Sequence, residues 1–115
     1  MLNPAQTGMV WEDVSSDIDT TSSGVYTVRY ARKCGDLVVF SVVMNTLTMT
    51  AGEVKSQNCF KTLRPLGNMS LAVFLTVAGD PLISVNLSTT GQVSARTNTA
   101  INGKQYQVSG CFVCA

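Results

Sequence analysis

Few residues of this chain could carry out catalysis. The 115 residues include no histidine and only seven aspartates and glutamates. Without histidine, the chain lacks the commonest general base, the usual partner of a nucleophilic serine or cysteine, and the commonest ligand of catalytic zinc. The close carboxylate pairs are Glu12–Asp13, which would point to opposite faces of a strand, and Asp17–Asp19, which lies in a serine-rich stretch. Neither pair is arranged to face across a cleft as in a glycosidase, and we predict that the protein is not an enzyme.

The four cysteines are the remaining candidates for chemistry. Cys111 and Cys114 form a C-x2-C motif, and with Cys34 and Cys59 they could supply four thiolates to zinc. In an extended strand, however, residues three apart project from opposite faces, so Cys111 and Cys114 would not chelate one ion. We predict free, mostly buried thiols and no metal or other cofactor, with a disulfide as the alternative.

The composition indicates a small and nearly neutral domain. A net charge of +1 favours neither nucleic acid nor an anionic membrane as a partner. Charged residues make up 13% of the chain and hydrophobic residues 45%, which favours either an oligomer or a neutral surface rich in Ser, Thr, Asn and Gln. No signal peptide and no membrane-inserting segment is recognisable. The triplets Asn68–Ser70 and Asn86–Ser88 match the glycosylation pattern, but without a secretory signal we assign them no role.

Two segments predict β-hairpins about glycine turns: Tyr26–Phe40, with its turn at Gly35, and Leu82–Thr97, with its turn at Gly91. In the second hairpin, apolar residues alternate with serine, asparagine and arginine, which is typical of strands with one buried and one wet face. In the first hairpin, alternation places Tyr26, Val28 and Tyr30 on one face of the strand. It places Thr27, Arg29 and Ala31 on the other face.

Two further segments are apolar on both faces, Asp36–Met44 and Met69–Val77, and the first is expected to bend near Asn45-Thr46. A domain of this size cannot build a three-layer core, so a sheet face left over after two layers pack must be covered by another subunit. We therefore predict a homo-oligomer with Val73 and Leu75 at its interface.

The rest of the chain also reads as strands. They are Met9–Val14, centred on Trp11, then Asn58–Leu63, and a last strand after a turn at Asn102-Gly103. Seven or eight short strands with frequent turns predict an all-β, antiparallel two-sheet β-sandwich or jelly roll, with a small β-barrel as the alternative. Residues 1–10, which include Pro4 and Gly8, are expected to be a linker or the end of a stalk.

Four stretches, taken in order, resemble a known family. They are Trp11 after the linker, Tyr30–Val38, Phe60–Pro65 and Ser88–Val93. Together they resemble the C-terminal head domains of bacteriophage tail fibres and baseplate receptor-binding proteins, in which a tryptophan strand precedes a Tyr-Arg-Lys-x-Gly-x-x-Val hairpin and an Arg-Pro segment. The resemblance covers the chain from Trp11 to its last residue.

The resemblance implies that residues 11–115 form a receptor-binding head that assembles as a homotrimer with other tail or baseplate proteins. It implies a virion component, made in the bacterial cytoplasm, that binds a cell-envelope saccharide without cutting it. The alternative is a purely structural tail or capsid-decoration domain without a receptor. A lytic tail enzyme is a third possibility, disfavoured by the lack of a paired-carboxylate constellation.

A neutral sugar is usually held by an aromatic face and planar polar side chains. From the residues able to do this, we predict Trp11, Arg64 and Tyr106 as carbohydrate contacts, although a tryptophan on an edge strand such as Trp11 more often serves in core or intersubunit packing. The wider set of candidates is Tyr26, Tyr30, Arg29, Arg96, Asn98 and Gln107.

Overall fold

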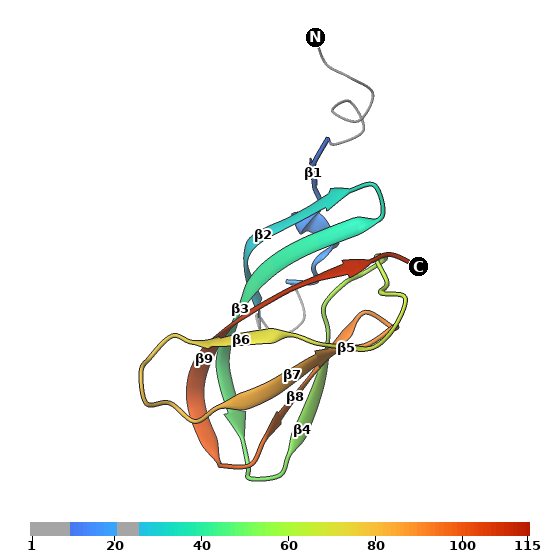
Figure 1. The fold of residues 1–115 in the computed structure, drawn as a ribbon. Coiled ribbons are helices and arrows are strands. Elements are labelled where there is room, and N and C mark those ends of the chain that lie inside the picture. Colours follow the sequence, from blue (N-terminus) through green and yellow to red (C-terminus); the bar gives the residue numbers. More distant parts are fainter. Residues whose placement is uncertain (1–9, 21–25) are drawn as a thin grey trace.

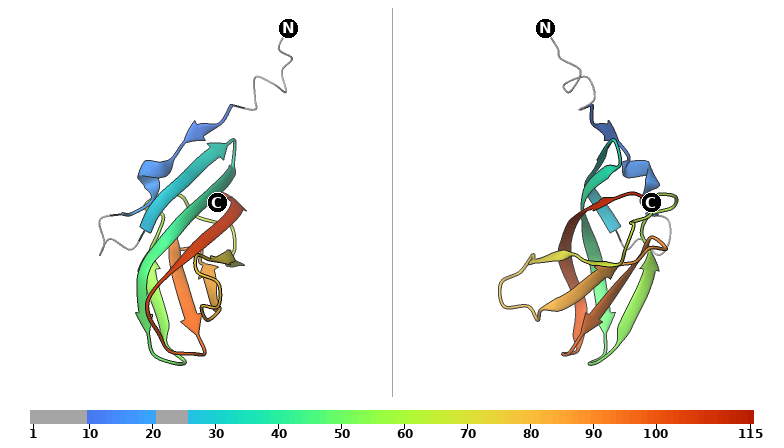
Figure 2. Two further views of the ribbon diagram at one scale, coloured as in Figure 1. Left: turned by 90° about the vertical axis from the view of Figure 1, so that its left-hand side faces the viewer. Right: turned by 45° about the vertical axis from the view of Figure 1, so that its right-hand side comes forward.

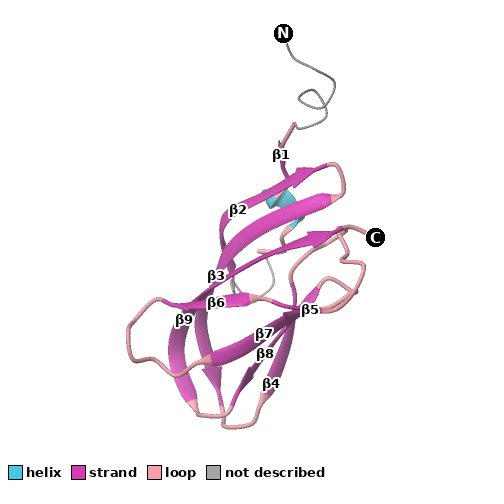
Figure 3. Cartoon of the chain, in the orientation of Figure 1, coloured by secondary structure: helices cyan, strands magenta, loops and turns pink. Residues whose placement is uncertain are grey.

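The computed structural model of the chain describes residues 10–20 and 26–115, which form an all-β fold with one short helical turn (Figures 1 and 3). Residues 1–9 of the predicted linker lie outside this part of the chain, as does Met9 of the first predicted strand. No helix in the described ranges is long and apolar enough to cross a membrane. The elements, in chain order, are β1 (Glu12–Asp13), η1 (Ser15–Asp17), β2 (Tyr26–Cys34), β3 (Leu37–Met49), β4 (Val54–Asn58), β5 (Met69–Ser70), β6 (Ala72–Leu75), β7 (Ile83–Leu87), β8 (Gln92–Thr97) and β9 (Ile101–Val113).

The strands form two antiparallel sheets. The order in the five-stranded sheet is β1-β2-β3-β9-β6, and the order in the four-stranded sheet is β4-β8-β7-β5. The long strands β3 and β9 run side by side through the middle of the larger sheet (Figure 2). The predicted all-β, two-sheet class is confirmed. Over residues 10–20 and 26–115 the sheets do not close into a barrel, so the barrel alternative is wrong.

The first predicted hairpin is confirmed, with a turn at Gly35 where φ is 58°. Its predicted alternation holds only as far as Val28. A register shift between Val28 and Tyr30 leaves Arg29 as an extra residue opposite β3, which is a β-bulge. The extra residue reverses the faces beyond it, so that Ala31 is buried and Tyr30 is exposed, contrary to the prediction.

The second predicted hairpin is confirmed in both pairing and facing. β7 and β8 pair antiparallel, and their alternate apolar residues are all buried. The turn contains Gly91 with φ 77°, and a Cβ at this position would lie 2.7 Å from the carbonyl oxygen of Phe60 and would also overlap the Arg64 guanidinium. Only glycine fits, because it tolerates positive φ and leaves room for the neighbouring segment.

Two register shifts in the β3–β9 ladder bear on the predicted bend after Met44 and the predicted turn at Asn102-Gly103. The predicted bend after Met44 is confirmed as a register shift between Met44 and Leu47. The predicted turn at Asn102-Gly103 is wrong, because both residues lie inside β9. Gly103 has φ 62° at a point where β9 contains one more residue than β3, so the glycine serves a bulge rather than a turn.

The segment predicted as one strand, Met69–Val77, is divided between the sheets. β5 pairs with β7 in the four-stranded sheet, whereas β6 pairs with β9 in the five-stranded sheet. Leu71 lies between them and its side chain is buried, while a Cβ on Gly110 would come within 2.6 Å of Leu71 Cδ2. The crossing therefore depends on the missing side chain at Gly110.

The predicted strand Asn58–Leu63 is also wrong, because β4 ends at Asn58. The following segment is irregular, and a side chain rather than a neighbouring strand satisfies part of its backbone. The carboxylate of Asp17 accepts hydrogen bonds from the Thr62 hydroxyl at 2.6 Å and the Leu63 amide at 2.9 Å. Phe60 in this segment packs edge-on against Phe40 of β3 and Phe112 of β9, with ring centroids 5.0 and 5.2 Å away, and so joins the core.

Candidate functional site

The three residues predicted to contact a saccharide lie in different environments. Trp11 is 41% exposed and immediately precedes β1, the edge strand of the five-stranded sheet. Tyr106 is 0% exposed in the core, and its hydroxyl donates to the Pro81 carbonyl at 2.6 Å. Burial also raises the pKa of the Tyr106 phenol. Tyr106 cannot touch a ligand at the surface, so this assignment is corrected to a core residue that anchors the β6–β7 loop.

The guanidinium of Arg64 has a structural role, because its hydrogen bonds go to backbone carbonyl groups. It donates to the carbonyl oxygens of Phe60 at 2.7 Å and Lys61 at 2.8 Å, and more weakly to that of Leu63 at 3.2 Å. These bonds hold the irregular segment after β4 in a compact shape. A saccharide would have to compete with those bonds, so the prediction of Arg64 as a ligand contact receives no support from its position.

The two predicted interface residues lie on the side of β6 that faces the core, but Val73 is partly buried whereas Leu75 is 36% exposed. In the register of β6, Val73 pairs with Val108 and Leu75 with Tyr106, both of which are buried. Val73 packs against the core of its own chain. Alternate residues of a strand face opposite ways, so Ala72 and Phe74 point outward instead. The outer positions of this strand are Ala72 and Phe74, the latter 52% exposed, and they suit contact with another subunit better than Val73 does.

The outer side of the four-stranded sheet is almost wholly polar, and we call it the polar face. Strand registers place four side chains in one row across all four strands, with further rows on either side. Ser56 and Ser94 share a hydrogen bond of 2.8 Å, and Ser70 donates to Asn86 at 3.1 Å. The central row is Ser56, Ser94, Asn86 and Ser70, and the flanking positions are Asn58, Gln92, Val54, Arg96 and Ser84.

An open groove of about 390 Å³ lies on the polar face where β5, β7 and β8 meet. Its walls come mainly from the two N-x-S triplets, because Met69 pairs with Leu87 and Ser70 with Asn86 in the β5–β7 ladder. The Asn86 carboxamide oxygen accepts from Ser70, and its nitrogen makes no hydrogen bond within the described residues. The groove therefore offers a free amide donor beside several hydroxyl groups, an arrangement suited to a neutral ligand rich in hydroxyls.

A second open groove of about 460 Å³ continues along β7 and β8. Leu82, Ser84, Arg96 and Asn98 line it together with Ile83. The sequence had suggested Arg96 and Asn98 as possible neighbours of a sugar, and the structure brings these two together. The wet side of the β7–β8 hairpin was recognisable from alternation, but the row that extends it to β4 and β5 depends on registers between distant segments.

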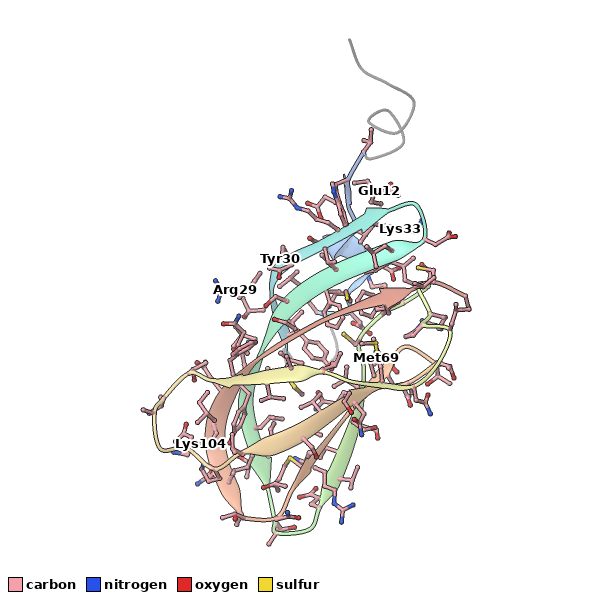
Figure 4. All side chains as sticks on the ribbon, viewed as in Figure 1. Glu12, Arg29, Tyr30, Lys33, Met69 and Lys104 are labelled. Atoms are coloured by element: carbon pink, nitrogen blue, oxygen red, sulfur yellow. The ribbon has the colours of Figure 1, made fainter. Side chains whose placement is uncertain are left out.

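The outer side of the five-stranded sheet differs in character, and we call it the aromatic face. Tyr30 of β2 and Phe74 of β6 are both exposed on it, with β3 and β9 between them. Figure 4 shows Arg29 and Tyr30 on the side of β2 turned away from the four-stranded sheet. The polar groups between the aromatic residues bond to one another: Arg29 donates to Gln107 at 2.7 Å, and Ser109 donates to Ser41 at 2.9 Å. The remainder is mainly aliphatic, with one cation and one thiol: Leu37, Val39, Val43, Val113, Arg32 and Cys111.

The acidic residues and cysteines show no arrangement typical of a catalytic or metal site. Hydrogen bonds from Ser15 lower the pKa of the Asp13 carboxyl, and Asp17 supports the segment after β4. Cys59 is buried as predicted, whereas Cys111 is exposed, contrary to the expectation of buried thiols. Cys114 is partly buried against the core, on the face of the chain opposite to Cys111. Within the described ranges, no three His, Cys, Asp or Glu residues are grouped to hold a metal ion.

No protein-family model matches the chain, and no curated protein sequence matches it.

Proposed function

We propose that residues 11–115 are a non-enzymatic recognition module of a bacteriophage tail that binds a cell-envelope saccharide through its polar face. The observation that carries the proposal is the row of hydroxyl and amide side chains across all four strands, with a groove of about 390 Å³ on it. Sugars present many hydroxyl groups that both donate and accept hydrogen bonds, and such side chains match them. No carboxylate belongs to β4, β5, β7 or β8, so the proposed site has no acid–base pair on its strands.

The module acts as a homotrimer with the jelly-roll arrangement of a receptor-binding head. The aromatic face supports this part of the proposal, since most of its polar groups bond to one another and most of its remaining surface is aromatic or aliphatic, with Arg32 as an exposed cation near its β1 edge. Covering such a surface with a second copy removes apolar area from water and leaves few polar groups without partners. The other partners are neighbouring tail or baseplate proteins, and the protein belongs to the virion after synthesis in the bacterial cytoplasm.

A structural tail or capsid-decoration domain is the second candidate. The aromatic face supports this candidate equally well. A domain that only assembles needs an exposed apolar surface for subunit contacts as much as a receptor-binding head does. The polar face distinguishes the two candidates, since only the first gives it a ligand.

The test compares binding of purified wild-type protein and variants to bacterial cells and to their purified envelope polysaccharides. The double variant Asn86→Ala, Ser70→Ala removes the amide donor and its hydroxyl neighbour from the groove. We expect binding to a recognised polysaccharide to weaken about tenfold, since each neutral hydrogen bond contributes roughly 1 kcal/mol. The matched control is Gln105→Ala, which removes an exposed amide from β9 in the other sheet and should bind like the wild type.

Polysaccharide chain length is measured after prolonged incubation in the same experiment, and we expect it to stay constant. Shortened chains would contradict the non-enzymatic assignment. Absence of binding to every bacterial surface tested would favour the structural candidate. Equal binding by the wild type and the double variant would place the saccharide elsewhere on the molecule.

A further inference from the structure

The polar face carries one cation and no acidic side chain on its strands. The sequences of β4, β5, β7 and β8 contain Lys55 and Arg96 but neither aspartate nor glutamate. Lys55 lies opposite the buried Ala95, and its ammonium group donates to the Thr48 carbonyl of β3 at 2.6 Å, so it is directed to the other sheet. Arg96 lies opposite Ser84 on the outer side and is exposed.

The Arg96 guanidinium is exposed at the surface and has no hydrogen-bond or ion-pair partner within the described residues. It lines the groove of about 460 Å³ next to the hydroxyl of Ser84 and the carboxamide of Asn98. Within residues 10–20 and 26–115, it makes no hydrogen bond or ion pair, in contrast to Arg64, whose guanidinium donates to three carbonyl groups.

The carboxylates nearest to this groove along the chain are engaged elsewhere. Asp80, two residues before Leu82 of the groove, forms an ion pair of 3.1 Å with Lys104. Glu53, the residue before β4, accepts a hydrogen bond of 2.9 Å from the Thr50 amide. Within residues 10–20 and 26–115, neither carboxylate forms an ion pair with Arg96.

We infer that the groove around Arg96 binds an anionic substituent of the saccharide, a carboxylate or a phosphodiester, next to a neutral sugar in the groove around Asn86. A planar guanidinium with five donors matches the paired oxygens of either anion, and the hydroxyl of Ser84 and amide of Asn98 supply further donors. Ser84 and Asn86 are two residues apart on β7, which separates the two grooves by about 7 Å along the strand. The inference rests on the proposed function and adds the substrate class: an acidic glycan whose charge lies about one sugar unit from the neutral contact.

The test uses the polysaccharide of a recognised strain in three forms of matched size: native, with carboxyl groups reduced to alcohols, and with phosphodiesters removed by hydrofluoric acid. The variants are Arg96→Gln and, as a charge-matched control, Lys61→Gln, which removes an exposed cation from the segment after β4. We expect Arg96→Gln to bind native polysaccharide about tenfold more weakly than wild type, the loss of one charge-assisted interaction, while Lys61→Gln binds normally. Rising salt should weaken wild-type binding much more than binding by Arg96→Gln.

The chemical treatments identify the anion. One treatment should lower wild-type affinity to the level of Arg96→Gln and should have no effect on the variant itself. If carboxyl reduction lowers the wild-type affinity, the anion bound by Arg96 is a carboxylate. If hydrofluoric acid treatment lowers it, the anion is a phosphodiester. Wild-type binding that survives both treatments, or equal binding by Arg96→Gln and wild type, would overturn the inference. In that case, a loss confined to the Asn86 and Ser70 double variant would leave the proposed function standing, whereas no binding by any form would remove both.

Discussion

Two arginines show how residue type alone leaves a role undecided. Arg64 and Arg96 were both candidates for a sugar contact. The Arg64 guanidinium donates its hydrogen bonds to carbonyl oxygens of its own segment, whereas Arg96 makes no such hydrogen bonds in the described structure. Tyr106 is a similar case, because an amphipathic aromatic residue can lie in the core or at the surface. Its neighbour in space, Pro81, provides the acceptor that makes burial of its hydroxyl acceptable.

A prediction at the residue scale concerns Cys59. Burial, assisted by the negative charges of Asp17 and Asp19, raises the pKa of its thiol from 9.0 to about 12. Above pH 9 the unfolded chain therefore releases a proton that the folded chain retains, so the stability contributed by this group falls as the pH rises. Between pH 8 and 10 we expect a loss of roughly 1 kcal/mol from this group.

Urea unfolding under reducing conditions at pH 8, 9 and 10 checks this for the wild type and Cys59→Ala. The variant starts from a lower stability because of its cavity, but its stability should decline less with pH. Cys111→Ala, which changes the exposed cysteine, should keep the wild-type dependence. Parallel pH curves for wild type and Cys59→Ala would refute the prediction.

At the scale of elements, alternation predicts strands well and their breaks poorly. Both hairpins were recognisable because their turns contain glycines with positive φ and their apolar residues recur at every second position. The bulge at Arg29 was not, since the extra residue is specified by pairing with β3 and leaves no mark on composition. The division of Met69–Val77 was missed for the same reason: a continuous apolar strand and two strands that change sheets share one pattern. The candidate site depends on such registers, so only its β7–β8 part was foreseeable.

A prediction at this scale tests the crossing between the sheets. Gly110→Ala should destabilise the fold by about 2 kcal/mol or more, because the new methyl group overlaps Leu71 Cδ2. Leu71→Ala should cost about 2–4 kcal/mol by leaving a cavity. In the double variant, the new methyl group enters the space that Leu71 vacates, so its cost should be well below the sum of the two.

Chemical unfolding of all four proteins gives this double-mutant cycle. The matched control pairs Leu71→Ala with Gly67→Ala, since a Cβ at Gly67 meets no atom within 4 Å and Gly67 has no positive φ. Additive effects in the Gly110 cycle would show that Leu71 does not depend on the space at Gly110.

For the molecule as a whole, the two outer faces divide the expected tasks. In the proposed function, the unpaired donors of the polar face bind the ligand, and the apolar area of the aromatic face contacts a second copy. Phe74→Asp should therefore convert a trimer to a monomer while preserving the fold, because the new charge would be buried only on assembly. Val73→Asp should instead prevent folding, since Val73 packs against its own core.

Light scattering at micromolar concentration and circular dichroism measure both outcomes. Val54→Asp is the matched control, because it places the same charge on an exposed valine of the four-stranded sheet and should leave the mass unchanged. A monomeric wild type, or a Phe74→Asp variant with the wild-type mass, would contradict the assignment of the aromatic face.

The pairing of β3 with β9 also constrains how the chain reaches its fold. Leu37 pairs with Val113, so the central ladder joins positions 76 residues apart. Nonlocal pairing of this kind makes folding slow, because the entropy of closing a long loop is lost before the contacts form. During synthesis on the ribosome, β3 can close on β2 early, but its other edge stays unpaired until β9 has emerged. A nascent chain is therefore open to association with its neighbours at that edge, and chaperones that shield it should raise the yield of assembled protein.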